Sequence, residues 1–313
     1  MEGILSTIIP IVLVLTIGWA ARKKGFIPTE FLVPGNRLVY YLAIPAMVFR
    51  AITRGGIDDH FHPLVLALTL VSVAGAYFSA FGVCKLKNIT APRAGTFIQS
   101  AGHGNQGHIS LPVAFYLLGD AGLAKAGIIA GFVMILQNIL SVSFLQLYQT
   151  TKRSRSIVAD ILIKLSRNPV IIAAMSGMLV AFFHIPLPFI VQRTIDMLGN
   201  MAPPLALLLI GASLSTSGMR THFRQVMGAV SIKLILLPAI GILLYRCVAG
   251  LPVTDFLPGL ILLICPTAAL SFVMAREIGG DPDFAVSSIS TSTLLSIFTM
   301  ATWLMIAHWM EAG

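Results

Sequence analysis

Apolar runs of about 20 residues recur from one end of this chain to the other, separated by short connections that hold most of its charges. Of the 313 residues, 57% are hydrophobic and 11% are charged, and the mean hydropathy is +0.89. A soluble domain of this length does not have such a composition. Because a helix needs about 20 apolar residues to cross the hydrocarbon core of a bilayer, we expect an all-α integral membrane protein with no folded soluble domain.

Hydropathy and helix-breaking residues divide the chain into ten predicted transmembrane spans. They cover residues 4–21, 35–51, 63–84, 95–118, 124–148, 168–184, 190–215, 226–248, 257–277 and 284–308. The first run has no basic residue before it and no small-residue cleavage site after it. We therefore interpret it as a retained helix and not as a signal peptide.

The basic residues show which connections lie in the cytoplasm. They cluster after the first, third, fifth and seventh spans, whereas the even-numbered connections are nearly balanced in charge. Since basic connections stay inside, we expect both termini on the outer, periplasmic side. The net charge of +9 therefore reflects the membrane topology. It does not indicate nucleic-acid binding, because the basic residues form no single patch. Residues 151–167 form the longest basic connection, which is either a cytoplasmic surface helix or a solvated linker.

The two halves of the chain resemble each other at an offset near 158 residues. Pro45 corresponds to Pro203, and Gly119 with Asp120 corresponds to residues 279–281. Each half, 1–150 and 168–313, holds five predicted spans, so the second half must enter the membrane the other way up. This pattern predicts two inverted five-helix repeats, an arrangement that recurs in secondary transporters with a midplane site between broken helices.

The fourth predicted span contains polar groups that a lipid-facing helix cannot use. Residues 101–119 hold glycines, histidines, amides and a proline, which loosen the helix and free backbone groups that lipid cannot satisfy. The repeat places the counterpart at 263–271, where Pro266 is followed by small and hydroxyl residues. We therefore expect the fourth and ninth helices to be broken, and the substrate site to use residues 103–112 and 265–272.

Ten residues are candidates for binding the substrate: His103, Asn105, Gln106, His108, Ser110, Pro112, Lys233, Pro266, Thr267 and Ser271. Asn105 and Gln106 could bind a carboxylate beside freed N–H groups at a helix end, or could only bond the broken backbone. The two histidines are five residues apart and point to different sides of a helix, which disfavours a metal pair. Either could carry a proton or make interhelical hydrogen bonds. Lys233 could attract an anion, or could extend to the cytoplasmic surface.

Cofactor and metal signatures are missing from the sequence. Residues 102–107 match G-x-G-x-x-G, but they lie in a membrane span without the soluble βαβ unit that a dinucleotide site needs. The three cysteines have no metal-ligand spacing. We expect neither a cofactor nor a metal. No acid lies deep in a predicted span, which weakens a carboxylate-based sodium or proton site.

Several motifs together resemble the auxin efflux carrier family over nearly the whole chain. They include N-R-L-V-Y-Y-L-A-I-P-A-M-V-F at 36–49, G-N-Q-G-H-I-S-L-P-V-A at 104–114, N-P-V-I-I-A-A-M-S-G at 168–177, A-P-P-L-A-L-L-L-I-G-A-S-L at 202–214 and C-P-T-A-A-L-S-F-V-M-A-R-E at 265–277. The resemblance implies a crossover of the fourth and ninth helices, an architecture similar to sodium/bile-acid symporters, and an elevator or rocking motion. It also implies a homodimer through scaffold helices.

The resemblance also suggests roles for single residues. Asn105 matches the family's substrate-contacting asparagine, and Pro112 matches its crossover proline. Plant members have a proline where this chain has Ser271, and an acid in the third span that residues 64–83 lack. These differences put cation coupling through that span in doubt and allow a differently shaped second crossover.

We therefore expect a secondary transporter for a small organic anion, a mono- or dicarboxylate such as malonate or an auxin-like acid, in a bacterial inner membrane. The alternatives are a proton- or sodium-coupled symporter of another solute, or a transporter-like receptor without net transport. A receptor would need an output domain, for which the connections are too short. An intramembrane enzyme would need more than His103, His108 and Ser110, which have no acidic partner.

Overall fold

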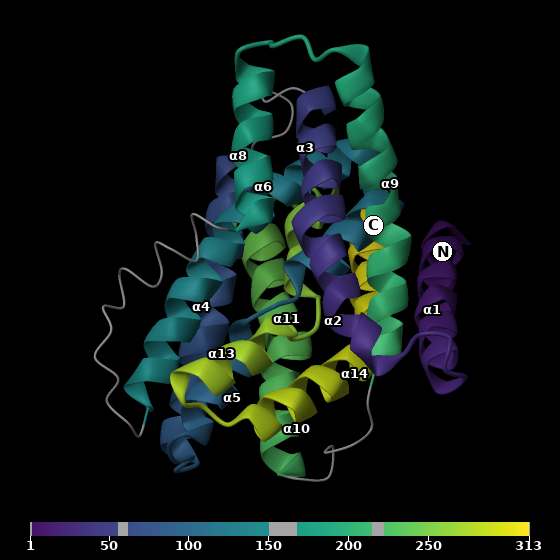
Figure 1. Cartoon of the computed structure of the whole chain (residues 1–313). Helices are drawn as coiled ribbons and strands as arrows, with labels where there is room; N and C mark the ends of the chain where they lie inside the picture. Colours follow the sequence, from purple (N-terminus) through teal and green to yellow (C-terminus); the bar gives the residue numbers. More distant parts are fainter. Residues whose placement is uncertain (1, 56–61, 150–167, 215–221, 313) are drawn as a thin grey trace. The chain divides into compact units, whose positions relative to one another are not determined.

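The structure is a computed structural model that describes residues 2–55, 62–149, 168–214 and 222–312. Within these ranges the regular secondary structure is helical, apart from one isolated β-bridge (Figure 1). The predicted all-α class is therefore confirmed. The predicted linker at 151–167 lies outside the described residues.

The helices follow one another along the chain with short connections. The first half contains α1 (Glu2–Lys23), α2 (Thr29–Leu38), α3 (Ile44–Gly55), α4 (Pro63–Leu86), α5 (Arg93–Gly102) and α6 (Leu111–Leu147). The second half contains α8 (Pro169–Phe182), α9 (Phe189–Ser213), α10 (Phe223–Ser231), α11 (Leu237–Ile242), α12 (Val253–Leu263), α13 (Leu270–Ile278) and α14 (Pro282–Ala312). Short π-helical segments extend some of these helices: η1 (Val39–Ala43), η2 (Gln106–Ser110), η3 (Ile232–Leu236) and η4 (Leu243–Val248).

Six helical runs in the described part of the chain are long and apolar enough to cross a bilayer. They are 29–54, 63–86, 106–147, 189–213, 223–248 and 282–311, and α8 and α12 are apolar but shorter. The chain is therefore a multi-pass membrane protein, as its composition predicts. The arrangement of ten spans in two inverted repeats stays a prediction.

Two predicted spans differ from single continuous helices. The span at 95–118 is divided, because α5 ends at Gly102 and the helix resumes at Gln106 and continues through α6 into the predicted fifth span. Gly119 interrupts α6 with φ 66° and ψ −163°, within the predicted connection between those spans. The span at 257–277 is divided between α12 and α13, with residues 264–269 outside both helices.

The chain forms two compact units, and each unit draws on both sequence halves. Unit 1 comprises residues 1–63, 106–131 and 166–214, and unit 2 comprises residues 64–105, 132–165 and 215–313. The units therefore cut across the sequence halves 1–150 and 168–313. The chain passes from one unit to the other after residues 63, 105, 131, 165 and 214.

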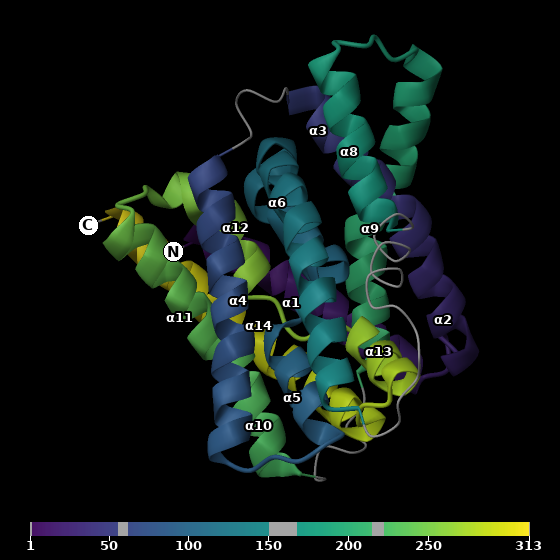
Figure 2. The ribbon, with the colours of Figure 1, turned by 90° about the vertical axis from the view of Figure 1, so that its left-hand side faces the viewer.

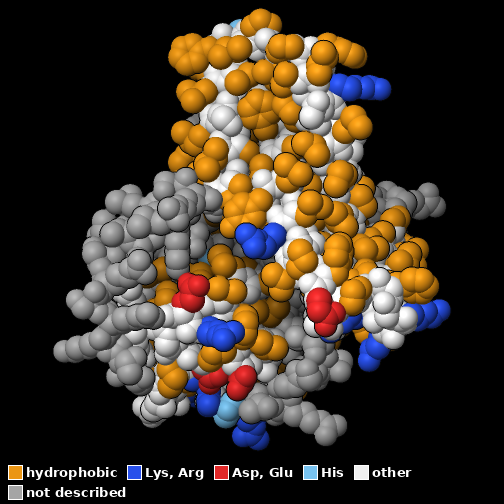
Figure 3. All heavy atoms as spheres, in the orientation of Figure 1, with side chains coloured by type: hydrophobic (Ala, Val, Ile, Leu, Met, Phe, Trp, Pro, Cys, Tyr) orange, Lys and Arg blue, Asp and Glu red, His pale blue; other side chains and the backbone are white. Residues whose placement is uncertain are grey.

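Unit 1 is organised around α3, which packs against α8 and α9 (Figure 2), while α1 packs along α9 (Figure 1). Figure 3 shows hydrophobic side chains covering the face formed by α8 and α9. Large apolar side chains there are strongly exposed, among them Phe182, Phe189 and Ile190. Such a surface is suited to lipid, in agreement with the transmembrane assignment.

Unit 2 places α5 against α10 and α14, and α13 against α14. The indole N–H of Trp303 in α14 donates to the Leu234 carbonyl at 2.8 Å. Arg93, at the start of α5, forms an ion pair of 2.9 Å with Asp281, just before α14. The Arg93 pair and the packing against α10 and α14 hold the broken helix α5 to helices from the second half of the chain, and the Trp303 bond joins two segments of that half.

Candidate substrate site

The helix breaks follow from the local sequence. Gly102 ends α5 where the Tyr77 ring lies so close that a Cβ atom at this position would sit 2.1 Å from Tyr77 Cε2. Only glycine fits this approach without a shift of the ring. In the second break, Pro266 has no backbone N–H and cannot continue α12.

The two breaks are hydrogen-bonded to each other within unit 2. Gly104 and Thr267 form an antiparallel β-bridge. The Asn105 N–H donates to the Pro266 carbonyl at 2.9 Å, and the Ala268 N–H donates to the His103 carbonyl at 2.9 Å. Backbone groups freed by the breaks thus satisfy each other, as non-helical backbone in a membrane protein requires. We call this paired segment, residues 103–105 and 266–268, the crossing.

Thr267 connects the crossing to two further helices. Its hydroxyl donates to the Ser100 carbonyl at 2.8 Å, and its N–H donates to Ser292 Oγ of α14 at 3.1 Å. Three residues farther on, α13 begins at Leu270, with Ser271 fully buried in its first turn. Within the described residues, the Ser271 hydroxyl has no hydrogen-bond partner. The crossing is therefore flanked by a helix N-terminus with a spare buried hydroxyl.

His103 belongs to a chain of hydrogen bonds on the α4 and α6 side of the crossing. Its Nδ1 lies 2.8 Å from Ser141 Oγ, which lies 2.7 Å from the Tyr77 hydroxyl. The Gln137 amide donates to the Gly102 carbonyl at 3.1 Å. These contacts satisfy the last carbonyl of α5 and fix the His103 ring between helices.

Asn105 differs from its neighbours in exposure, because it is half-buried while Gly104 and Gln106 are buried. Its backbone is held by the crossing through the Pro266 carbonyl. The half-buried side chain is thus attached to a fixed backbone position at the end of the first break. This placement suits a residue that contacts a ligand.

The remaining first-half candidates lie in unit 1. Ser110 donates to Gln106 Oε1 at 2.9 Å, and the His108 ring stacks on Tyr40 with ring centroids 5.7 Å apart. Pro112 is buried in the first turn of α6. The candidate set predicted from sequence is therefore divided at residues 105 and 106. His103, Asn105, Lys233, Pro266, Thr267 and Ser271 belong to unit 2.

Lys233 does not extend to a surface. Its side chain is fully buried in η3, and Nζ donates to the Leu263 carbonyl at 3.2 Å. Leu263 is the last residue of α12 and precedes the crossing by three residues. The alternative of a lysine that extends to the cytoplasmic surface is therefore excluded in this structure.

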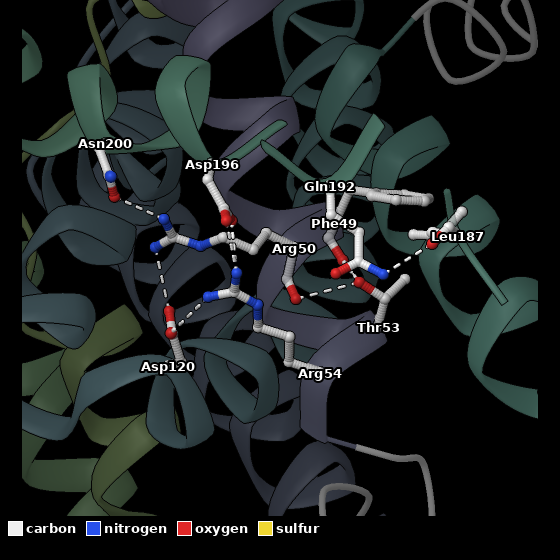
Figure 4. Close-up of polar contacts among 9 residues, drawn as sticks. All are labelled: Phe49, Arg50, Thr53, Arg54, Asp120, Leu187, Gln192, Asp196 and Asn200. Carbon is white, nitrogen blue, oxygen red and sulfur yellow. Dashed lines mark hydrogen bonds and ion pairs between the residues drawn. The ribbon is translucent and has the colours of Figure 1, made fainter. Parts of the chain in front are cut away.

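Unit 1 contains a cluster of ionic contacts that sequence reasoning missed (Figure 4). Arg50 donates to Asn200 Oδ1 at 2.5 Å and to Asp120 at 3.1 Å, and Arg54 contacts Asp196 at 2.6 Å. In the sequence, Arg54, Asp120 and Asp196 served only as charges of the connections, and Arg50 was not among the candidate residues. The sequence feature that could have indicated this cluster is Arg50, an arginine at the end of an apolar run.

A cavity of about 610 Å³ lies beside this cluster, lined by residues of α3, the end of α8 and the start of α9. Arg50 and Arg54 face it together with Asp196 and Gln192. Asp120 and Asp196 neutralise the two arginines. The cavity therefore lacks the excess positive charge that an anion site needs, and the cluster acts as a brace between α3, α9 and the Gly119 turn.

Comparison with known proteins identifies the family. The model of a family described as membrane transport protein matches residues 3–153 and 141–304. The chain belongs to this family. Membership confirms the resemblance to the auxin efflux carriers that the sequence motifs indicated.

Relatives of this transport protein cover almost its whole length at low identity. A protein of Rhizobium meliloti (strain 1021) named "Putative malonate transporter" is 23% identical over 303 residues, which span 96% of this chain and 94% of that protein. "Uncharacterized transporter MJ1031" of Methanocaldococcus jannaschii is 23% identical, with 96% and 97% covered. "Uncharacterized transporter YfdV" of Escherichia coli (strain K12) is 21% identical, with 97% and 98% covered.

Proposed function

We propose that this protein is a secondary transporter that moves a small organic anion, a mono- or dicarboxylate, across a bacterial inner membrane by alternating access. Membership in a membrane transport family supports the general class. A relative named as a malonate transporter, similar over nearly the whole chain, supports a carboxylate as the substrate. The transporter itself needs no enzymatic step for this activity.

The hydrogen-bonded crossing is the observation that carries the proposal. In unit 2 the crossing pairs Gly104 with Thr267 in a β-bridge, and the N–H of the half-buried Asn105 donates to the Pro266 carbonyl. The N-terminus of α13 follows directly, with its positive helix dipole and the buried Ser271 hydroxyl. Amide donors, a hydroxyl and a helix N-terminus together form a chemistry that binds a carboxylate without a full opposing charge.

The two glycine turns support an inverted repeat in the proposal. Gly119 has φ 66° and is followed by Asp120, and Gly279 has φ 86° and is followed by Gly280 and Asp281. Each aspartate is paired with an arginine of its own unit. Corresponding positions in the two halves thus share a glycine with positive φ and an aspartate paired with an arginine, although ψ differs between Gly119 (−163°) and Gly279 (33°).

The two compact units support a motion of one unit against the other. Each unit combines segments from both sequence halves, so neither half can move alone as a block. We assign the crossing, in unit 2, to a transport domain and unit 1 to a scaffold. Periplasmic termini, and a homodimer through the helices of unit 1, belong to the same proposal.

Two asparagines allow a controlled test of the site. Asn105 lies at the crossing, whereas the Asn138 amide donates to the Met134 carbonyl of its own helix at 2.8 Å. Purified protein is mixed with malonate, succinate, lactate or indole-3-acetate, and unfolding temperature and uptake into vesicles are measured. We expect one acid to stabilise the wild type and Asn138→Ala, but not Asn105→Ala.

Other outcomes would contradict parts of the proposal. Stabilisation that survives in Asn105→Ala would move the site away from the crossing. A wild type that neither binds nor transports any of the acids would exclude the organic-anion assignment. Equal losses in both variants would indicate a general folding defect and not a ligand contact.

A further inference from the structure

Lys233 is a buried basic residue that the proposed substrate site leaves unexplained. It lies in η3, between α10 and α11, and its side chain is fully buried. Lys85 and Lys87, at the end of α4, are exposed. Since a buried ammonium requires compensation for the loss of water, its neighbours must provide it.

The compensation comes from the end of α12. Nζ donates to the carbonyl of Leu263, the last residue of that helix, at 3.2 Å. The final carbonyls of a helix have no partner within it and carry a partial negative charge. Cys265, two residues farther on, is a second neighbour of the ammonium. The lysine thus caps the negative end of a broken membrane helix.

Among the described residues, no carboxylate forms an ion pair with Lys233. The ion pairs there involve Arg50, Arg54 and Arg93, and none includes Lys233. The local charge at the end of α12 is therefore one ammonium against backbone carbonyls. This is an unusual way to use a buried lysine, because a carboxylate would be the ordinary counter-charge.

The position of Lys233 at the C-terminal end of α12 explains why a lysine contacts backbone carbonyls there. In transporters with broken helices, unwound carbonyls and the C-terminal ends of half-helices are the groups that hold a coupling cation. Here the C-terminal end of the half-helix α12 is already occupied by a cation that belongs to the chain. The crossing begins three residues later, at Pro266.

We propose that the Lys233 ammonium is a tethered replacement for a coupling cation at the C-terminal end of α12. The inference rests on the proposed function, because it describes how that same transporter is driven. Because the Lys233 ammonium is part of the chain, the crossing keeps its geometry throughout the transport cycle without bound sodium or potassium. The organic anion then moves without an inorganic co-ion, and its own charge makes transport respond to the membrane potential.

Two substitutions separate the charge of Lys233 from its volume. Lys233→Ala removes the ammonium and leaves space for an ion at the α12 carbonyls, whereas Lys233→Met removes the charge and fills the space. Unfolding temperature of the purified protein is measured in sodium, potassium and choline chloride at equal ionic strength. Uptake into vesicles is measured in the same three salts.

The wild type is expected to unfold within about 1 °C of the same temperature in all three salts. Lys233→Ala is expected to be less stable in choline and to gain about 5 °C from sodium or potassium at ~100 mM, because an ion binds only its folded form. Lys233→Met is expected to show no such gain. Uptake should follow the same order, with a loss of about tenfold for Lys233→Ala in choline that an inorganic cation reverses.

Each contrary result would overturn the inference. Sodium-dependent stability or uptake of the wild type would show that a free cation is still needed. A Lys233→Ala protein that responds to no cation, or that responds no more than Lys233→Met, would show that the site holds none. If Lys233→Ala does not fold in any salt, the wild-type comparison alone still decides. The unfolding measurements need no substrate, so they remain decisive even if no organic anion is transported.

Discussion

Replacing Arg50 with methionine tests whether the ionic cluster braces unit 1. Arg50 is 5% exposed and contacts Asn200 at 2.5 Å, Asp120 at 3.1 Å and the Phe115 ring at 5.5 Å from its centroid. Methionine keeps most of the apolar stem but removes every polar contact. The change therefore isolates the guanidinium from the packing around it.

The magnitude follows from these contacts. A buried hydrogen bond that involves a charged group contributes about 1.5–3 kcal/mol. The contact with Asp120 adds only about 0.5 kcal/mol, because the aspartate side chain is 39% exposed and solvent screens the pair. The cation–π contact with Phe115 adds about 0.5–1 kcal/mol. We expect Arg50→Met to lower the free energy of unfolding by about 3 kcal/mol, or the unfolding temperature by about 6 °C.

Arg54 provides the matched control one helical turn later. Its side chain is 49% exposed, and its pair with Asp196 has the short distance of 2.6 Å. Solvent screening reduces the value of such a pair to about 0.2–1 kcal/mol, so Arg54→Met should lower the unfolding temperature by about 1 °C. Scanning fluorimetry in one detergent measures both variants. Equal shifts for Arg50→Met and Arg54→Met would refute the argument that burial determines the strength of the brace.

Substitutions at three further positions test single contacts, each by the same unfolding measurement. Gly102→Ala should lower stability by about 1–3 kcal/mol, because its Cβ would overlap the Tyr77 ring; a shift below experimental error would contradict the close approach. Asp281→Ala should be less stable than Asp281→Asn by about 1 kcal/mol, since Asp281 Oδ1 accepts the Phe284 N–H at 3.0 Å and asparagine can keep that cap; the reverse order would exclude the capping role. Ser141→Ala should cost about 1–2 kcal/mol by removing a hydroxyl that lies between two buried polar groups, and an unchanged unfolding temperature would show that these groups find other partners.

The positions of the helix breaks could be predicted because they depend on local chemistry. Glycines and a proline mark the two breaks in the sequence, and the internal repeat indicated the second break from the first. The apolar runs defined the membrane helices for a similar reason. An apolar run and the helix-breaking residues inside it are both encoded within about 20 residues of sequence.

The contacts of the charged residues could not be predicted in the same way. Arg54 pairs with Asp196, 142 residues away, a partner that no local pattern of the sequence indicates. The acceptor of Lys233 is a backbone carbonyl, and every residue carries one, so no side chain marked Leu263 as the partner. Tertiary arrangement alone selects such partners.

The distribution of charge gives a physical reason to favour an anion at the crossing. The ion pairs of the described residues are neutral overall, because their three arginines are matched by three aspartates. Lys233 is the exception, since it is buried near the crossing without a carboxylate among the described residues. Charges in a poorly screened interior act over longer distances than in water. A cationic solute would be repelled by this lysine, whereas a carboxylate held by Asn105 and the start of α13 would be attracted, so neutralising Lys233 should weaken anion binding even without direct contact.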